Sequence, residues 1–88
     1  MPKAQAGDAL AQNELGLHYA TMRDYSEAAR WFRAAAEQGD AYAQTELGRC
    51  YLEGRGVARD REKAAEWYGR AAAAGYEPAV EALRELAQ

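Results

Sequence analysis

The sequence predicts an all-α fold, and three features lead to that prediction. Alanine accounts for 22 of the 88 residues, whereas the chain has only two valines and no isoleucine. Alanine, glutamate and arginine favour helices, while sheets need β-branched and aromatic residues on a pleated surface. Apolar residues recur at helical spacing, and whole blocks of sequence repeat along the chain. A helical repeat therefore fits this sequence, and a β-barrel or a doubly wound sheet does not.

The chain contains two copies of one unit and the start of a third. Residues 7–16 align with residues 39–48 at an offset of 32, and residues 24–35 align with residues 60–71 at an offset of 36. Repeats of this length stack on one another in a shared architecture. The third copy begins at Gly75. We therefore expect a single domain with four parts: an N-terminal tail (1–6), repeat 1 (7–38), repeat 2 (39–74) and a capping helix that is half of a third repeat (75–88).

Each copy predicts an antiparallel pair of helices. Apolar residues of the first helix fall four residues apart, which is one face of a 3.6-residue period. They are Ala11, Leu15 and Tyr19 in the first copy and Ala43, Leu47 and Tyr51 in the second. The extra residues of the second copy lie between Tyr51 and Asp60, where the glycines at 54 and 56 indicate a loop.

Capping residues predict where the other helices begin and end. Asp24 and Asp60 have the character of N-caps, and Glu27 lies where it would complete a capping box with Asp24. Gly39 and Gly75 follow the apolar stripes, where a left-handed residue would end a helix. Near Pro78, whose fixed φ suits a first helical turn, a fifth short helix begins.

Two glycines lie inside predicted helices, although glycine costs about 1 kcal/mol there relative to alanine. We interpret Gly16 and Gly48 as points of close approach, at which Trp31 or Trp67 of the partner helix crosses. The third copy has Arg84 at the matching position. An arginine there indicates a terminal helix with a polar outer face, as stacked repeats require.

The second copy carries small and aromatic residues at fixed spacing, namely Leu47, Gly48, Tyr51, Gly54, Gly56, Val57, Asp60, Lys63, Ala64, Trp67, Tyr68, Ala71, Ala72 and Gly75. This pattern resembles the Sel-one-like repeat (SLR) family, a relative of the tetratricopeptide repeat. The resemblance covers residues 7–87 and implies a short right-handed α-α superhelix of two helix-turn-helix repeats plus a C-terminal capping helix. The first copy lacks the Gly-x-Gly-Val loop and is similar to the tetratricopeptide spacing. The resemblance implies an adaptor or scaffold that binds a protein or peptide.

The residues that could carry a reaction are few, and we expect no enzyme, no cofactor and no metal site. A Cys–His nucleophile from Cys50 and His18 would also need an oxyanion donor and an orienting group. We expect both residues at the semi-buried seam between helices. Two such ligands do not complete a tetrahedral zinc site. Gly54 and Gly56 follow no predicted strand and precede no Gly-Lys-Ser/Thr, so we interpret them as a turn and not a phosphate loop.

Charge and hydropathy exclude two further classes of partner. The chain has 14 acidic and 11 basic residues, and the arginines around the predicted loop alternate with acidic residues, which argues against nucleic-acid binding. Trp31 and Trp67 recur beside alanines, so we place them in the core and not in a base-stacking site. No apolar run is long enough to span a membrane, and the N-terminus lacks the apolar stretch of a signal peptide. With one cysteine, a cytoplasmic location is expected.

The predicted partner-binding surface is the face of the first helices that is not packed on a partner helix. The family's repeat geometry places there positions at which the copies differ. The predicted residues are Leu10, Asn13, Leu17 and Thr21 from the first copy, Tyr42, Thr45, Arg49, Leu52 and Glu53 from the second, and Glu81 and Glu85 from the third. The alternative is that the leucines cover a curved core and that Arg49 pairs with Glu81 or Glu85.

Two functions follow from this surface. The first is a protein-interaction module that binds a peptide or a partner helix on the concave face of its first helices. The second is a self-associating scaffold unit, a homodimer formed through exposed terminal helices. Two and a half repeats fall short of the three that stacked repeats usually need, which gives self-association a physical motive.

Overall fold

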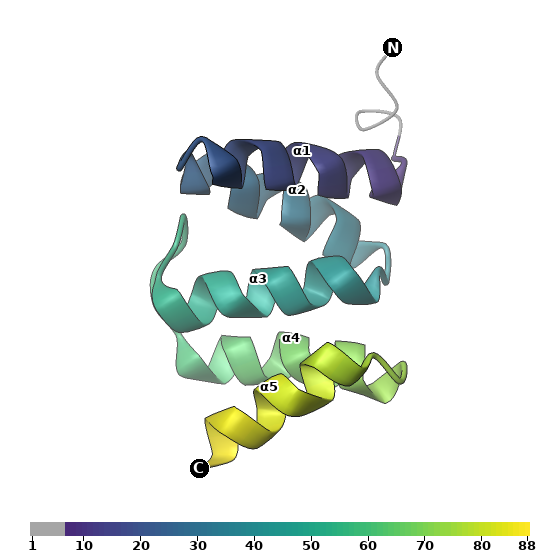
Figure 1. Cartoon of the computed structure of the whole chain (residues 1–88), viewed down its shortest axis with the longest axis vertical. Coiled ribbons are helices and arrows are strands. Elements are labelled where there is room, and N and C mark those ends of the chain that lie inside the picture. The colour runs from purple at the N-terminus through teal and green to yellow at the C-terminus, as the bar shows by residue number, and fades with distance from the viewer. Residues whose placement is uncertain (1–6) are drawn as a thin grey trace.

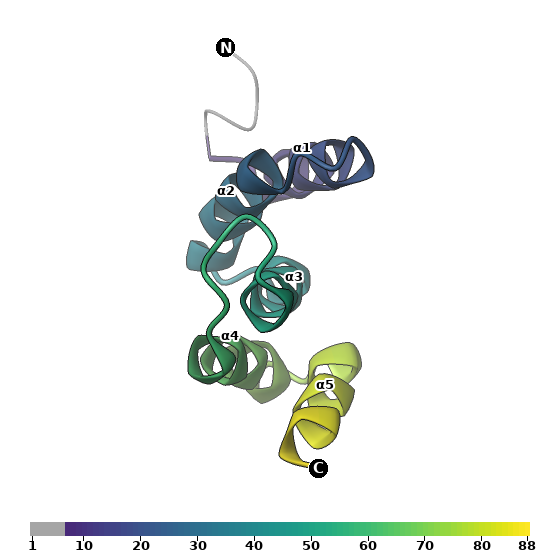
Figure 2. The ribbon, with the colours of Figure 1, turned by 90° about the vertical axis from the view of Figure 1, so that its left-hand side faces the viewer.

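The computed structural model describes residues 7–88, which form five α-helices and contain no strand within that range. The helices are α1 (Ala9–Thr21), α2 (Tyr25–Glu37), α3 (Ala41–Glu53), α4 (Arg61–Ala73) and α5 (Glu77–Ala87). They stack in chain order from one end of the molecule to the other (Figure 1). The second view shows α1, α3 and α5 on one side and α2 and α4 on the other (Figure 2). The predicted all-α solenoid is confirmed. The predicted tail, residues 1–6, lies outside the described residues.

Aspartates begin four of these five helices. Asp8, Asp24, Asp40 and Asp60 each accept a hydrogen bond from the backbone N–H three residues later, at 2.8 to 3.3 Å. Such caps satisfy an N–H that has no partner within its own helix. The predicted capping box is only half formed. The Asp24 N–H donates to the carbonyl of Tyr19 at 2.9 Å, and the Glu27 carboxylate instead pairs with Arg30 of the next turn at 3.5 Å.

Glycines with positive φ connect the helices. Gly39 (φ 95°) and Gly75 (φ 86°) follow α2 and α4, as predicted. Gly54 (φ 70°) ends α3 and Gly56 (φ 76°) lies in the loop to α4, so the loop interpretation is also confirmed. The turn between α1 and α2 is shorter and uses Arg23 (φ 62°), a non-glycine residue in the left-handed region. The two copies therefore make the same connection with different turns.

The core consists of alanines, with a few large side chains between them. Ala35, Ala43, Ala64 and Ala71 are completely buried, as is Leu47. Alanines at these positions allow neighbouring helices to approach closely, and the spaces between them are filled by large apolar groups. Those groups include Phe32, Tyr51 and Tyr68, each at most 5% exposed.

The glycines inside α1 and α3 do mark close approaches, but to other aromatic residues than predicted. A β-carbon at Gly16 would lie 2.7 Å from the ring of Phe32, and one at Gly48 would lie 2.8 Å from the ring of Tyr68. The tryptophans one position earlier turn about 100° away on the helix. Both are half-buried, and arginines lie over their rings: Arg30 over Trp31 at 5.7 Å and Arg70 over Trp67 at 4.4 Å.

Candidate partner-binding surface

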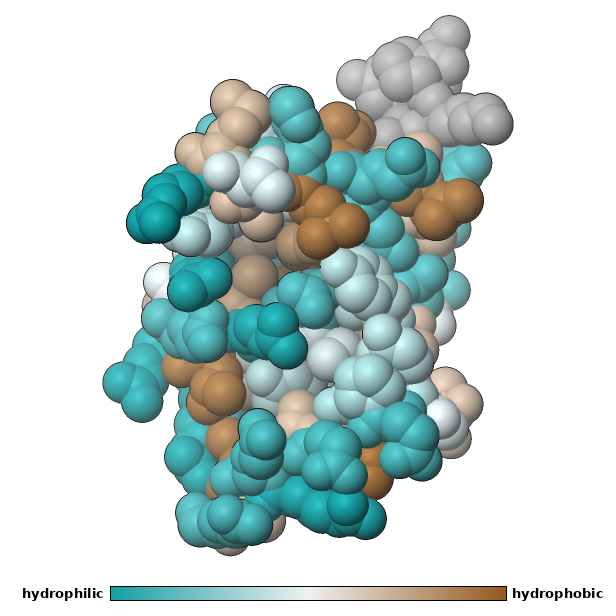
Figure 3. All heavy atoms as spheres, viewed as in Figure 1, coloured by the Kyte–Doolittle hydropathy of each residue, from teal (hydrophilic) through white to brown (hydrophobic). Residues whose placement is uncertain are grey.

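The candidate surface is the side of the stack formed by α1, α3 and α5, which we call the concave face. In Figure 2, α3 is displaced from α1 and α5 towards α2 and α4, so the helices on this side follow a concave curve. Figure 3 views the same side: apolar groups gather over α1, whereas the part over α5 is mostly hydrophilic. The face therefore changes character along the stack.

Two equivalent rows of side chains line the upper and middle parts of this face. Both follow helical spacing, so that each row lies along one side of its helix. The α1 row is Leu10, Glu14, Leu17 and Thr21, and the α3 row is Tyr42, Glu46, Arg49 and Glu53. Leu10 is 69% exposed and Leu17 is 44% exposed, so neither leucine contributes much to the core.

Asn13 and Thr45 were predicted on this face, and the structure buries both of them. Asn13 is 6% exposed and its amide nitrogen donates to the Asp40 carboxylate at 3.1 Å. Thr45 is 2% exposed and its hydroxyl donates to the carbonyl of Ala41 at 2.9 Å. The prediction that a groove presents them is wrong, because their positions face the seam between helices.

Glu14 and Glu46 lie where Asn13 and Thr45 were expected. The sequence comparison missed them because it selected positions at which the copies differ, and both copies have glutamate here. Helical spacing alone would have placed Glu14 on this face, because it lies four residues after Leu10 and three before Leu17.

The remaining predicted residues lie at or near the surface. Leu52 is half-buried against the core, and Glu53 is exposed and pairs with Arg55 at 3.0 Å. The hydroxyl of Thr21 donates to the carbonyl of His18 at 2.7 Å within its own helix.

On α5, Glu81 and Glu85 are exposed, and Glu81 pairs with Arg84 at 2.6 Å. Arg49 pairs with Glu46 of its own helix at 3.7 Å. The alternative pairing of Arg49 with Glu81 or Glu85 is therefore wrong, because Arg49 and Glu81 each pair within their own helix.

The α3 row forms a polar cluster in which the pKa values of two residues are raised. Burial raises the pKa of Glu46, Glu53 raises it further, and Arg49 opposes the shift. Burial also raises the pKa of Tyr42, to which the charge of Glu46 contributes. A carboxylate with a raised pKa is incompletely stabilised by its surroundings. Arg49 offsets only part of this effect, so the ionised form of Glu46 is disfavoured in the fold.

The two copies differ at two related positions: the aromatic residue that lies under the helix glycine and the surface residue that follows that glycine. Under Gly16 the first copy places the apolar ring of Phe32, and under Gly48 the second places Tyr68. Burial raises the pKa of Tyr68, and the nearby charge of Arg49 opposes that shift. The neighbouring surface residue is Leu17 in the first copy and Arg49 in the second. The part of the concave face on α1 is therefore the more apolar one, and the part on α3 is the more polar one.

The repeat geometry agrees with comparisons to known proteins. The family model of the Sel1 repeat matches residues 9–40 and again residues 41–76. The chain belongs to the Sel1 repeat family. Sel1 repeats generally mediate protein–protein interaction, and their fold is a structural scaffold that is not typically enzymatic.

Two solved structures show how far this likeness extends. A Sel1 repeat protein from Oxalobacter formigenes is 43% identical with a TM-score of 0.89, over 93% of this chain and 65% of that one. The protein c5321, a protective antigen present in uropathogenic Escherichia coli strains and displaying an SLR fold, is 40% identical with a TM-score of 0.89, over 94% of this chain and 18% of that one. This chain thus spans less than two thirds of either relative. No curated protein sequence matches it.

This Sel1 repeat chain places its two nucleophile candidates in surroundings that do not activate them. Cys50 is 8% exposed, and burial together with the charges of Glu46 and Glu53 raises its pKa to about 11. A reactive cysteine needs the opposite surroundings, partly exposed and electropositive. His18 is exposed on α1 and meets the ring of Tyr19 edge-on at 5.5 Å. The expectation of a semi-buried seam therefore applies to Cys50 and is wrong for His18.

Within residues 7–88, no three histidine, cysteine, aspartate or glutamate side chains gather closely enough to hold a metal ion. None of the helices in that range has the length and apolar character needed to cross a bilayer.

Proposed function

We propose that this chain binds a peptide or a partner helix on its concave face, across α1 and α3. One observation carries the proposal: Leu10 and Leu17 are both exposed and lie on the same side of α1, on the face of the stack that also carries the polar row of α3. Single exposed leucines are ordinary on a surface, but two on the same side of one helix offer a partner two apolar contact points, one on each side of Glu14.

The two halves of the face suggest the chemistry of the partner. Apolar side chains of the partner would pack on Leu10 and Leu17. A carboxylate or amide of the partner would reach Arg49, whose present ion pair with Glu46 is long at 3.7 Å. Tyrosine and arginine are the residue types that most often anchor interfaces, and Tyr42 and Arg49 provide one of each. This Sel1 repeat unit would thus recognise an amphipathic segment of the partner by the order of its apolar and polar groups.

The experiment compares proteins captured by the immobilised domain and by matched variants. Arg49→Glu and Leu17→Glu change the concave face, and Tyr42→Ala removes an aromatic ring that meets Phe32 edge-on at 6.3 Å. We expect a partner that the wild type retains and that each of these variants loses by about tenfold or more, because an interface anchor contributes about 2 kcal/mol.

Arg30→Glu is the matched control. Arg30 and Arg49 are both exposed, and each pairs with the glutamate three residues before it, but Arg30 lies on α2. A partner lost equally with Arg30→Glu would contradict the concave face, as would a loss of helicity in the variants.

The second candidate is self-association through α1. Leu10 and Met22, near the two ends of α1, are 69% and 61% exposed, and α1 is the first helix of the stack. Sedimentation equilibrium over a wide concentration range tests it. A dimer that Leu10→Glu dissociates would favour self-association, and a monomer throughout would exclude it.

A further inference from the structure

Two basic side chains from different repeats meet at the ring of Tyr51, near the end of α3. They come from α2 and α4, the helices on the side of the stack opposite the concave face (Figure 2). The Arg33 guanidinium donates a hydrogen bond to the Tyr51 hydroxyl and lies 5.9 Å from the centre of its ring. The Lys63 ammonium lies 5.5 Å from the same ring centre. We call these three residues the Tyr51 cluster.

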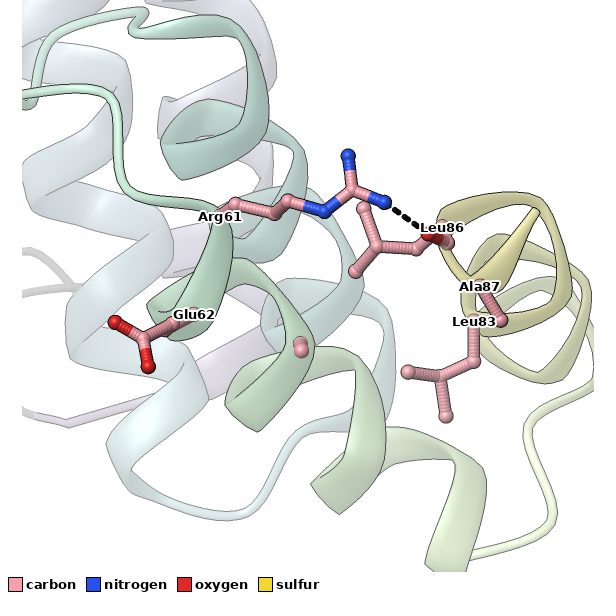
Figure 4. A pocket seen from close by; sticks show the side chains of 6 residues that line it. Arg61, Glu62, Leu83, Leu86 and Ala87 are labelled. Atoms are coloured by element: carbon pink, nitrogen blue, oxygen red, sulfur yellow. Dashed lines mark hydrogen bonds between the residues drawn. The ribbon is translucent and has the colours of Figure 1, made fainter.

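No carboxylate balances the two charges of the Tyr51 cluster. Of the aromatic rings that basic groups contact within residues 7–88, Tyr51 is the one contacted by two. The ion pairs of that part of the chain involve other arginines, so neither Arg33 nor Lys63 belongs to one. Arg61, also outside the ion pairs, instead donates to the carbonyl of Leu86 on α5 (Figure 4). Two like charges at one ring repel each other, and an anion bound to both would remove that repulsion.

The acidic residues nearest to the two cations along their helices do not pair with them. Glu37 and Glu66 lie one helical turn after Arg33 and Lys63, and both are exposed. Asp60 uses its carboxylate to accept the backbone N–H of Lys63 at 3.0 Å, which caps α4. The charged ends of Arg33 and Lys63 are thus available to a ligand from outside the chain.

The Tyr51 hydroxyl adds a third donor. It accepts the hydrogen bond from Arg33, so its own proton remains to be donated, and residues 7–88 provide no acceptor for that proton. The side chain is 5% exposed, and a buried hydroxyl proton without an acceptor costs stability. The cluster therefore combines a guanidinium, an ammonium and a hydroxyl, all of which donate hydrogen bonds.

The Tyr51 cluster does not belong to the framework that the two copies share. Lys63 corresponds to Glu27 in the first copy, a residue of opposite charge. Arg33 corresponds to Gly69 in the second copy, which has no side chain. Stacking of the repeats therefore does not by itself require two cations at this ring.

We propose that the Tyr51 cluster binds a phosphate monoester, carried by a phosphorylated side chain of a partner protein. Such a group has about 1.5 to 2 negative charges at pH 7 and three oxygens that accept hydrogen bonds. It matches two cations and three donors, whereas a carboxylate or a phosphodiester has one charge and leaves one cation unmatched. Because Sel1 repeats generally mediate protein–protein interaction, a protein is the source that we favour. The cluster shares no residue with the rows of the concave face, so either site can fail without the other.

The test is a nuclear magnetic resonance titration of the isotope-labelled chain with a short neutral peptide that contains one phosphoserine between glycines. We expect shifts at the amides of Arg33, Tyr51 and Lys63 and a Kd on the order of 1 mM, because the peptide offers little besides its phosphate. The peptide with unmodified serine should cause no shifts. A peptide with glutamate in place of phosphoserine should bind at least about fivefold more weakly, because it has one charge.

Variants of the chain separate the cluster from the rest of the surface. Arg33→Gln and Lys63→Gln should each weaken binding of the phosphopeptide at least about fivefold, because each removes one of the two charges. Both side chains are exposed, so these variants should keep their helicity by circular dichroism. Tyr51→Phe removes only the hydroxyl and should weaken binding about threefold.

Arg30→Gln is the matched control for the charge variants. Arg30 is also an exposed arginine of α2 that lies over an aromatic ring, that of Trp31 at 5.7 Å, but it is already paired with Glu27 at 3.5 Å. Its replacement should leave the Kd unchanged. An equal loss with Arg30→Gln would show a general effect of positive charge and would contradict a site at Tyr51.

Other outcomes would also overturn the proposal. Absence of shifts at millimolar phosphopeptide, equal binding of the serine peptide, or a Kd that Lys63→Gln leaves unchanged would each exclude it. Vesicles of phosphatidylcholine with a phosphorylated inositol lipid test the same chemistry on a membrane. Vesicles that bind the wild type and not Lys63→Gln, without binding of the peptide, would assign the cluster to a lipid headgroup. A single-stranded oligonucleotide that binds more tightly than the peptide would assign it to phosphodiesters.

Discussion

The ring of Tyr68 lies directly against the α-carbon of Gly48. A β-carbon at residue 48 would come within 2.8 Å of two ring atoms and within 3.2 Å of the Ala64 carbonyl oxygen. The ring is 3% exposed and has neighbours on its other side, so it has little room to move. The pair explains why a residue that weakens helices lies in the middle of α3, and it sets the distance between α3 and α4.

Replacing Gly48 by alanine should destabilise the fold by up to about 2 kcal/mol. The overpacking cost of about 1–3 kcal/mol exceeds the gain in helix propensity of about 1 kcal/mol. Gly69→Ala is the matched control, since Gly69 is also inside a helix but nothing lies within 4 Å of its β-carbon position. That variant should gain up to about 1 kcal/mol. Urea unfolding followed by circular dichroism measures both, and a more stable Gly48→Ala variant would contradict the packing.

Gly56→Ala should cost more stability than Gly39→Ala, although both glycines have positive φ. At Gly39 the added β-carbon would contact nothing, so the only cost is that of holding alanine in the left-handed conformation, about 1–2 kcal/mol. At Gly56 the β-carbon would also collide with the backbone of Tyr25, so the loop must lift off α2. Thermal unfolding compares the two, and hydrogen exchange should show faster opening at the start of α2 in Gly56→Ala alone. Equal losses in both variants would argue against the contact.

Cys50 should react slowly with thiol reagents in the folded chain. Burial raises its pKa to about 11, so that roughly one thiol in a thousand is ionised at pH 8. Unfolding in urea should accelerate alkylation by at least about a hundredfold, because the free thiolate is exposed. A folded-state rate close to that of the unfolded chain would show that the thiol is accessible.

The same thiol predicts a loss of stability in alkali. Its pKa in the fold, about 11, is above the ordinary value of 9.0. Between these values the unfolded chain has released the proton and the folded chain has not, so stability falls as the pH rises through that range. Cys50→Ala should flatten this part of the curve of unfolding free energy against pH. An unchanged slope would assign the alkaline loss to Tyr42 and Tyr68, whose pKa values burial also raises.

Glu46→Gln should stabilise the chain at neutral pH. Burial raises the pKa of this carboxyl above its ordinary 4.5, so the fold favours the protonated form. The resulting contribution to stability is present below pH 4.5 and is lost as the pH rises through the higher pKa of the fold. A neutral amide avoids that loss, so the difference between variant and wild type should disappear in acid. Glu14→Gln, at the equivalent and exposed position of α1, should change little.

Local signals in the sequence were sufficient to predict the helices and their connections. Asp8, Asp40 and the other aspartates begin helices, and glycines such as Gly39 end them, because caps and left-handed residues act over three or four residues of chain. The repeated apolar spacing then implies pairs of helices, since each helix has one face to bury.

The choice between adjacent residues could not be made in this way. Phe32 and Trp31 are both aromatic, and Glu14 and Asn13 are both polar, so composition does not say which member of each pair faces a glycine or the solvent. Neighbours on a helix point about 100° apart, and a small rotation of the helix exchanges them. Packing against the next helix sets that rotation.

By itself, then, the sequence determined the fold class, the repeat and the family likeness, because these depend on periodicity and on short-range capping. Only the tertiary structure decided which side chains line the concave face and which aromatic ring lies against each helix glycine. Ala29 and Ala65 are identical residues at equivalent positions, yet Ala29 is 3% exposed and Ala65 is half-buried. That difference arises from contacts between segments far apart in the chain, which no local pattern contains.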